Sequence, residues 1–216
     1  LFYRWVQPSR DAIDAPICVG TCALYRRAAL AAAGGFAQIQ HSEDVHTGVK
    51  ILRAGYAVRY VPIVLSKGEC PDSLSAFMSQ QYRWCAGSMS LMTSSEFRHM
   101  KLTFRQRLCF WSGFGYYITT AVAAFAALVP PIFLLWFEPQ AIRPENYLWL
   151  VPAVLVYPLT RVMNVGDWRL TVLRVQLIYA YCHAVSIWDT YRGGLAEWVA
   201  TGAVTKTPLT TKITRV

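Results

Sequence analysis

The stretch Ser73-Leu74-Ser75-Ala76-Phe77-Met78-Ser79-Gln80-Gln81-Tyr82-Arg83-Trp84-Cys85-Ala86-Gly87 lies near the middle of the 216-residue chain. Ser73 is a preferred helix N-cap residue, and we predict a helix from there to about Met92. One face of this helix is apolar and consists of Leu74, Phe77, Met78, Cys85, Met89 and Met92. Gln80, Arg83, Trp84 and Gly87 follow the spacing i, i+3, i+4, i+7 and share a different face. A polar and aromatic stripe that ends in glycine indicates the wall of a groove that another group approaches closely.

The sequence before this helix alternates between strand-like and helix-like segments. Residues 16–25 and 58–65 are rich in β-branched and other apolar side chains, and we predict strands there. Residues 26–33 and 43–54 have helical patterns, and each is followed at once by glycine, which tolerates the left-handed conformation of a helix C-terminus. Such alternation is typical of an α/β domain.

The sequence after this helix is strongly apolar. Residues 97–111 alternate apolar with basic side chains, which is typical of a helix on an anionic membrane surface or of an ordinary surface helix. Residues 112–137 form an uncharged run long enough to span a bilayer, and 147–163 form a second candidate span. A third segment, about 170–188, either spans the bilayer or lies at its interface; we favour an interfacial or re-entrant segment because the basic tail then stays inside.

We therefore predict an α/β part followed by α-helical transmembrane segments, with helix dominating overall. The expected domains are an α/β part at 1–95, an interface helix at 96–111, membrane helices at 112–190 and a cytoplasmic tail at 191–216. The distribution of Arg and Lys places the first part on the cytoplasmic side of the plasma (inner) membrane.

Composition separates several classes of function. The formal net charge of +9 is compatible with a nucleic-acid binder, but the basic residues flank apolar segments in a chain that is 55% hydrophobic. A membrane surface and anionic nucleotide substrates fit that distribution better than nucleic acid. The six cysteines form no C-x-x-C pair and no Cys/His cluster with zinc spacing, so we expect reduced thiols and no metal site of this kind.

The sequence Ser42-Glu43-Asp44 allows two interpretations. Acidic residues in the first turn of a helix are favoured by the helix dipole, and this alone would explain Glu43 and Asp44. The functional alternative is that the pair is catalytic, with Asp44 as a general base. A sugar hydroxyl that attacks an anomeric carbon must lose its proton, and a positioned carboxylate accepts it.

The residues of the central helix also have two interpretations each. Arg83 is either an ion-pair residue or a contact to a diphosphate, whose negative charge grows as it departs. Trp84 is either a core residue or a flat platform for a sugar ring. Gln80 is either a surface amide or a donor to a phosphate or sugar oxygen. His41 and His46 have the wrong spacing for two ligands on one helical turn, so we interpret them as structural.

Together these residues resemble the C-terminal half of a processive family 2 glycosyltransferase, the group that contains cellulose, chitin and hyaluronan synthases. The Thr-Glu-Asp motif of that family appears as Ser42-Glu43-Asp44, and its Gln-x-x-Arg-Trp motif is intact at residues 80–84. Gly34-Gly35-Phe36 precedes both, and apolar segments follow them, in the family's order. The resemblance implies a partial GT-A-like domain.

The resemblance also implies roles. Asp44 matches the catalytic base, Gln80 and Arg83 match residues near the donor diphosphate, and Trp84 matches the aromatic residue that stacks on the acceptor sugar. Gly20 and Thr21 match a Cys-Gly-Ser stretch beside the acceptor, although Val19 replaces its cysteine. Val204-Thr205-Lys206 loosely resembles a gating loop.

The implied enzyme is a hexosyltransferase that takes sugar from a UDP-sugar to a growing β-linked polysaccharide by inversion, and translocates the polymer. Mg²⁺ or Mn²⁺ is implied as cofactor, with ligands upstream of this chain, so this piece alone is not expected to be active. A non-processive transferase with a lipid acceptor and a non-catalytic membrane scaffold or channel subunit are the alternatives. Which sugar is transferred is not specified by these motifs.

Overall fold

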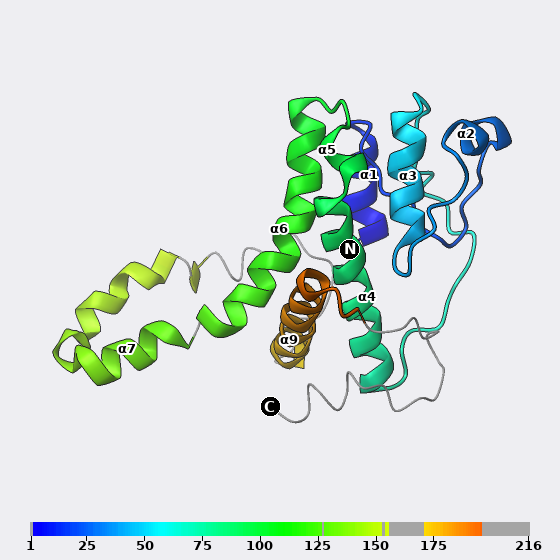
Figure 1. The fold of residues 1–216 in the computed structure, drawn as a ribbon. Coiled ribbons are helices and arrows are strands. Elements are labelled where there is room, and N and C mark those ends of the chain that lie inside the picture. Colours follow the sequence, from blue (N-terminus) through cyan, green and yellow to red (C-terminus); the bar gives the residue numbers. More distant parts are fainter. Residues whose placement is uncertain (1, 127, 153, 156–170, 196–216) are drawn as a thin grey trace.

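The computed structural model describes residues 2–126, 128–152, 154–155 and 171–195, and the regular structure within these ranges is helical (Figure 1). The elements, in chain order, are η1 (Phe2–Val6), α1 (Gln7–Asp11), α2 (Arg27–Ala32), α3 (Glu43–Arg53), α4 (Leu74–Thr93), α5 (Ser95–Arg98), α6 (Phe104–Ala126), α7 (Val129–Phe137), η2 (Pro139–Ala141), η3 (Pro144–Leu150) and α9 (Thr171–Arg192). Helix α4 contacts α3, α5, α6 and α9, so it forms the centre of the fold.

The predicted α/β fold class is wrong for the residues described. Segments 16–25 and 58–65 form no regular structure and do not pair into a sheet, and residues 20–22 are a bend. Their backbone groups instead bond to side chains: Gln7 exchanges two hydrogen bonds with the backbone of Ile17, at 2.6 and 3.0 Å. The N–H of Tyr60 likewise donates to a carboxylate oxygen of Asp11 at 2.9 Å. Since side chains satisfy these groups, no neighbouring strand is required.

The predicted helices before and within the central stretch are confirmed. α2, α3 and α4 fall within about a residue of the predicted bounds, and Gly34 and Gly55 follow the first two with φ of +73° and +85°. The Ser73 hydroxyl accepts a hydrogen bond from the N–H of Ala76 at 3.3 Å, as its N-cap role requires. Ser42 differs, because it takes a left-handed φ of +56° and its side chain caps nothing.

The core lies where α4, α5 and α6 meet. Cys85 and Met89 of α4 are fully buried, which confirms the predicted apolar face at these positions. Phe97 packs its ring against the rings of Phe110 and Phe114 of α6, with centroids 5.4 and 5.1 Å apart. Phe97 and Met100, which were predicted to face a membrane surface, therefore lie in the protein interior, whereas Phe104 and Leu108 of the same segment are exposed.

Among the described residues, the predicted interface helix is not one continuous helix and no predicted membrane span is found. The segment expected to be one amphipathic helix divides into α5 and the start of α6, with a break at residues 99–103. No helix among the described residues combines the length and apolar character that crossing a bilayer requires. The run 112–137 is interrupted between α6 and α7, close to Pro130 and Pro131, which lack the N–H that continues a helix. Part of the second candidate span, 156–163, and residues 196–216 of the tail lie outside the described residues.

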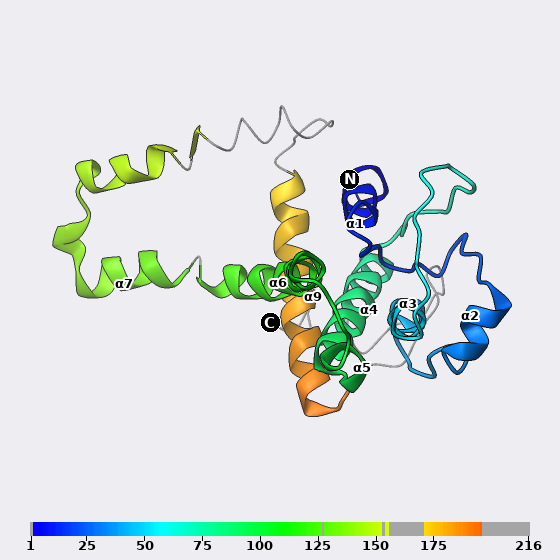
Figure 2. The same ribbon diagram turned by 90° about the horizontal axis from the view of Figure 1, so that it is seen from above.

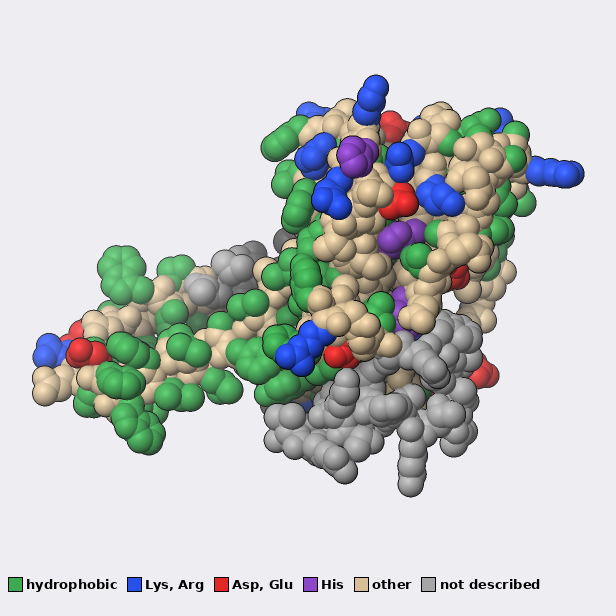
Figure 3. All heavy atoms as spheres, viewed as in Figure 1, with side chains coloured by type: hydrophobic (Ala, Val, Ile, Leu, Met, Phe, Trp, Pro, Cys, Tyr) green, Lys and Arg blue, Asp and Glu red, His purple; other side chains and the backbone are tan. Residues whose placement is uncertain are grey.

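Helix α7 and the turns η2 and η3 extend as an arm away from the other helices (Figures 1 and 2). The arm presents exposed apolar side chains, which Figure 3 shows along its length. The most exposed among them are Leu135, Trp136, Phe137, Leu148 and Trp149. Lys and Arg side chains gather at the other end of the molecule, over α5 and the start of α6 (Figure 3).

The N-terminal segment is fastened to α6 through Arg10. Its guanidinium donates to the carbonyl oxygens of Ala15 (2.9 Å) and Cys109 (3.0 Å) and lies 4.9 Å from the centroid of the Phe110 ring. Arg10 is buried, so these contacts compensate in part for the hydration that the cation loses, while Nη2 has no hydrogen-bond partner among the described residues. The anchored segment leads directly into residues 16–22, which approach the start of α3.

Candidate active site

Asp44 is the second residue of α3, and main-chain groups hold its carboxylate. The N–H of Gly20 donates to Oδ2 at 2.6 Å, and the N–H of Val45 donates to Oδ1 at 2.8 Å. Burial raises the pKa of Asp44; these two hydrogen bonds act in the opposite direction, and the charge of Glu43 raises it further. A fixed carboxylate with a raised pKa is suited to accept a proton.

Gly20 and Thr21 belong to a bend in the segment that lies against the start of α3. A Cβ on Gly20 would lie only 3.3 Å from Asp44 Oδ2, so the backbone approaches the carboxylate closely. Cys18 packs against Gly48, where an added Cβ would lie 2.6 Å from the Cys18 Cβ. Thr21 is exposed to solvent. The structure thus places Gly20 in contact with Asp44, whereas Thr21 is exposed beside this contact.

Glu43 does not share the position of Asp44. Its side chain is exposed and borders a shallow cavity with Phe36 and Gln38. It acts on Asp44 through charge alone, since it raises the pKa of that carboxyl. A direct part in proton transfer is therefore better supported for Asp44 than for Glu43.

The groove predicted beside Gly87 is filled by the loop that carries Ser42. A Cβ on Gly87 would overlap the Oγ and Cβ of Ser42, so only glycine allows this contact. Gly87 lies one helical turn after Arg83 and Trp84, and Ser42 lies two residues before Asp44. The contact therefore joins the Ser-Glu-Asp segment to the helix that carries Gln80, Arg83 and Trp84.

The three candidate binding residues of α4 lie at the surface of the helix rather than in the core. Trp84 is 49% exposed, so its ring has a face available for a ligand. Gln80 and Arg83 are partly buried, and burial lowers the pKa of the Arg83 guanidinium without removing its charge at neutral pH. This placement agrees with the predicted platform and phosphate contact, whose function stays a prediction.

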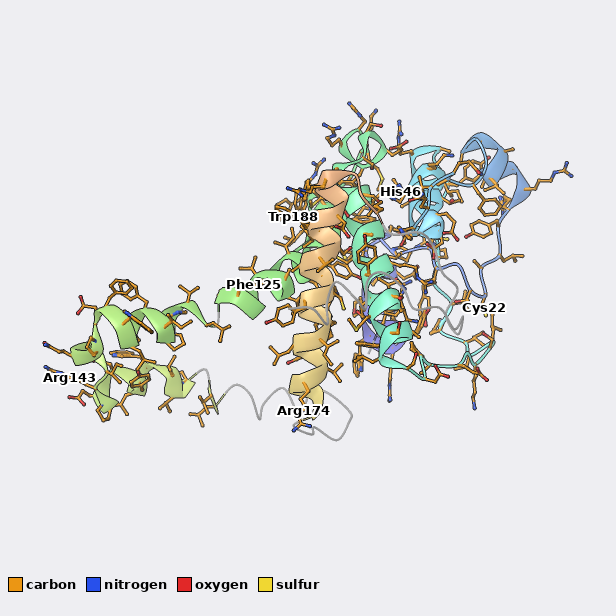
Figure 4. The ribbon with its side chains drawn as sticks, turned by 60° about the horizontal axis from the view of Figure 1, so that its bottom comes forward. Cys22, His46, Phe125, Arg143, Arg174 and Trp188 are labelled. Atoms are coloured by element: carbon orange, nitrogen blue, oxygen red, sulfur yellow. The ribbon has the colours of Figure 1, made fainter. Side chains whose placement is uncertain are left out.

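A cavity of about 530 Å³ lies between the loop at residues 37–41, α3 and α4. His46 lines it and hydrogen-bonds Ser90 Oγ through Nε2 at 3.0 Å; Figure 4 shows its position on α3. Burial lowers the pKa of His46, so the ring is neutral at neutral pH. This packing is consistent with the structural part predicted for His46.

Sequence reasoning missed Tyr25. Its hydroxyl lies 3.1 Å from Cys18 Sγ, beside Asp44, and burial raises its pKa. Its position near the end of the predicted strand gave no sign of this contact. A second link, between Cys22 Sγ and Ser66 Oγ at 2.9 Å, joins this segment to the loop at residues 56–72, and Cys22 is labelled in Figure 4.

Residues that could hold a metal are not gathered in one place in the part of the chain that the structure describes. Within the described ranges, no three His, Cys, Asp or Glu side chains are close enough together to ligate an ion. The described residues thus do not form a site for Mg²⁺ or Mn²⁺.

Comparison with known proteins identifies a family and several relatives of this chain. Residues 7–204 match the family described as glycosyl transferase family group 2. Cellulose synthase 2 of Novacetimonas hansenii is 29% identical over 192 residues, or 88% of the chain, and cellulose synthase 1 of Komagataeibacter xylinus is 33% identical over 155 residues, or 71%. The UDP-forming cellulose synthase 1 catalytic subunit of Komagataeibacter xylinus is 31% identical over 143 residues, or 66%. The chain spans only 11%, 10% and 19% of the length of these three proteins.

Proposed function

Because the chain belongs to glycosyl transferase family group 2, we propose that it supplies the acceptor side of a processive, UDP-sugar-dependent hexosyltransferase. The observation that carries the proposal is the joined geometry of the two motifs. Asp44 is held by the Gly20 N–H, and its loop packs through Ser42 on the helix of Arg83 and Trp84. A base, a cation and an exposed aromatic ring thus lie on adjoining elements.

In the proposed reaction, a hydroxyl of the acceptor sugar loses its proton to the carboxylate of Asp44. The hydroxyl oxygen forms a bond to the anomeric carbon of the donor while the bond from that carbon to the diphosphate oxygen breaks. The electron pair leaves with UDP, and attack from the opposite side inverts the configuration to give a β-linkage. Arg83 stabilises the charge that develops on the diphosphate.

Trp84 and Gln80 position the substrates in this scheme. The exposed face of Trp84 is available to stack on the last sugar of the acceptor, and Gln80 donates to a nearby phosphate or sugar oxygen. A platform that accepts each newly added sugar allows repeated addition, which is the basis for proposing a growing β-linked polysaccharide as acceptor.

The donor and the cofactor are further parts of the proposal. The similar Komagataeibacter xylinus catalytic subunit is a UDP-forming cellulose synthase, and cellulose is a polymer of glucose, which makes UDP-glucose the first donor to test. We also propose Mg²⁺ or Mn²⁺ as the ion of the complete enzyme, with ligands from outside the described residues. For localisation, we propose the cytoplasmic face of the inner membrane, supported by the exposed apolar arm and the basic end of the molecule.

The test is UDP release by the full-length protein that carries this chain, with a panel of UDP-sugars and an oligosaccharide acceptor. We expect release with one or two donors and a product several sugars longer than the acceptor, degraded by a β-specific glycanase. Products extended by a single sugar would support the non-processive alternative. Folded protein that releases no UDP from any donor would contradict the proposal and favour the scaffold alternative.

A further inference from the structure

Helix α4 presents two opposite faces, and the second one is held by α9. Successive residues of an α-helix are about 100° apart, so Tyr82, Cys85 and Met89 project about 180° away from the stripe of Gln80 to Gly87. Tyr82 is 1% exposed and Cys85 is fully buried. α9 lies along α4 and also packs against α6 (Figures 1 and 2). The face of α4 that carries Gln80, Arg83 and Trp84 therefore takes its orientation from the packing of α9 against the opposite face.

The contacts between α4 and α9 are polar as well as apolar. The Tyr82 hydroxyl donates to Asp189 Oδ2 at 3.1 Å, and the Ser186 hydroxyl donates to the Tyr82 carbonyl oxygen at 3.0 Å. Cys85 Sγ lies 3.7 Å from the carbonyl oxygen of His183. Ser186 is 0% exposed and Asp189 is 7% exposed, so these bonds are shielded from water. Directional bonds in a buried interface fix rotation and register more tightly than apolar contacts do.

α9 is itself fixed to α6. His183 Nδ1 lies 2.7 Å from Thr120 Oγ1, and the imidazole lies among the rings of Tyr116, Tyr117 and Tyr179. Ser186 and Asp189 follow His183 at i+3 and i+6, so all three project from neighbouring positions of one helix face. A continuous series of contacts therefore runs from Thr120 of α6 through α9 to Tyr82 of α4.

We propose that Tyr82, Ser186 and Asp189 are positioning residues that set the rotation of α4 about its axis, and with it the placement of Arg83 and Trp84 relative to Asp44. The proposal rests on the proposed transferase function and adds residues that touch neither donor nor acceptor. Tyr82 stands inside the Gln-x-x-Arg-Trp motif, one residue before Arg83, so a rotation at Tyr82 moves Arg83 with it. A displacement of about 1 Å at a reacting group lowers rates by about 100-fold.

The test compares Tyr82→Phe, Ser186→Ala, Asp189→Asn and Tyr82→Phe/Asp189→Asn in the full-length protein. We expect kcat to fall by about 10- to 100-fold in Tyr82→Phe and Asp189→Asn. The kcat of the double variant should be only slightly lower than that of the less active single variant, because the Tyr82 hydroxyl and the Asp189 carboxylate act as one unit. Phe97→Leu is the matched control, since it removes buried packing between α5 and α6 and leaves the hydrogen-bonding groups of Tyr82, Ser186 and Asp189 in place.

The comparison with Phe97→Leu separates positioning from stability. The proposal requires kcat to fall much further in Tyr82→Phe than in Phe97→Leu at an equal loss of Tm. Equal losses of kcat in the two variants would overturn it, because both changes would then act through stability alone.

A second measurement keeps the inference separate from the transferase function. Amide hydrogen exchange over residues 80–87 should be faster in Tyr82→Phe and Asp189→Asn than in wild type, but unchanged in Phe97→Leu. Unchanged exchange in all variants would overturn the positioning role even if UDP release is normal. Faster exchange in a protein that releases no UDP would support the α4–α9 coupling and contradict only the proposed function.

Discussion

The Asp44 carboxylate and the Arg83–Trp84 pair are held in different ways. Main-chain N–H groups fix Asp44 directly, at 2.6 and 2.8 Å. Arg83 and Trp84 instead take their place from the helix that carries them, which α9 holds through Tyr82 from the opposite side. The base is thus organised by local backbone, whereas the binding residues depend on a segment about 100 residues further along the chain. The two parts meet at Gly87, where Ser42 packs.

The largest expected effect on stability comes from Gly87→Ala, which disrupts the contact between Gly87 and Ser42. The new Cβ would overlap Ser42, so the loop before Asp44 must move, at a cost of about 3 kcal/mol. Thermal unfolding and UDP release should both report the loss. Ser42→Gly in the same protein should recover most of it, because glycine removes the clashing atoms and accepts the φ of +56°. The control is Gly68→Ala, which meets no atom within 4 Å; an equal loss there would contradict the account.

The next effect is a loss of stability at low pH, and it concerns His183 of α9, the helix that packs against α4. Burial lowers the pKa of His183 from 6.5 to about 4, and its Nε2 has no hydrogen-bond partner among the residues described. The unfolded chain therefore binds this proton first, so stability is lost as pH falls from about 6.5 to about 4. The difference between these values corresponds to roughly 3 kcal/mol.

Denaturant unfolding at a series of pH values checks this expectation. His183→Gln keeps a polar group near Thr120 and should flatten the dependence on pH. A smaller slope should remain in this variant, because burial also lowers the pKa of His46. A profile unchanged by His183→Gln would show that other groups cause the acid sensitivity.

Trp84→Ala tests the exposed side of α4 with a smaller effect. Because the ring is 49% exposed, its removal should change Tm little, while the KM for the acceptor rises and kcat/KM falls by about 10-fold. Trp84→Phe keeps a flat ring and should lie between wild type and Trp84→Ala. A large fall in Tm with an unchanged KM would mean that Trp84 is a packing residue.

The smallest effect tests the local support of Asp44. The base requires its carboxylate form, so activity is lost as pH falls through its raised pKa, and the acid limb lies above 3.8. Gly20→Pro removes the N–H that donates to Oδ2, and this should move the limb of kcat/KM up by roughly one pH unit or less. Gly20→Ala keeps the N–H and should move the acid limb of kcat/KM less than Gly20→Pro does. A downward shift in Gly20→Pro would contradict this reading of the hydrogen bond.

The helices were predictable because local signals determine them. Ser73 caps α4, and Gly34 and Gly55 follow the helices that precede it. The strands were predicted wrongly because the groups that satisfy residues 17 and 20 are side chains of Gln7 and Asp44, which periodicity does not reveal. The predicted spans failed for a different reason, since the apolar run 112–137 is divided between α6 and α7 next to Pro130 and Pro131, and no described helix has the length and apolar character to cross a bilayer.

The candidate site was predictable in part. The motifs pointed to Asp44, Arg83 and Trp84, and the glycine at the end of the stripe pointed to a close contact. The identity of that contact, Ser42, and the link from Tyr82 to Asp189 join residues that are distant in sequence. One sequence without a structure carries no information on such pairs.

The most direct measurement compares the rate of UDP release by Asp44→Asn and Glu43→Gln in the full-length protein. The two carboxylates are neighbours, but only Asp44 is held by the Gly20 N–H while Glu43 is exposed. Loss of a general base lowers rates by about 10²- to 10⁴-fold, so we expect a fall of this size in Asp44→Asn and less than about fivefold in Glu43→Gln. Comparable rates in the two variants, or a larger loss in Glu43→Gln, would contradict the assignment of Asp44 as the base.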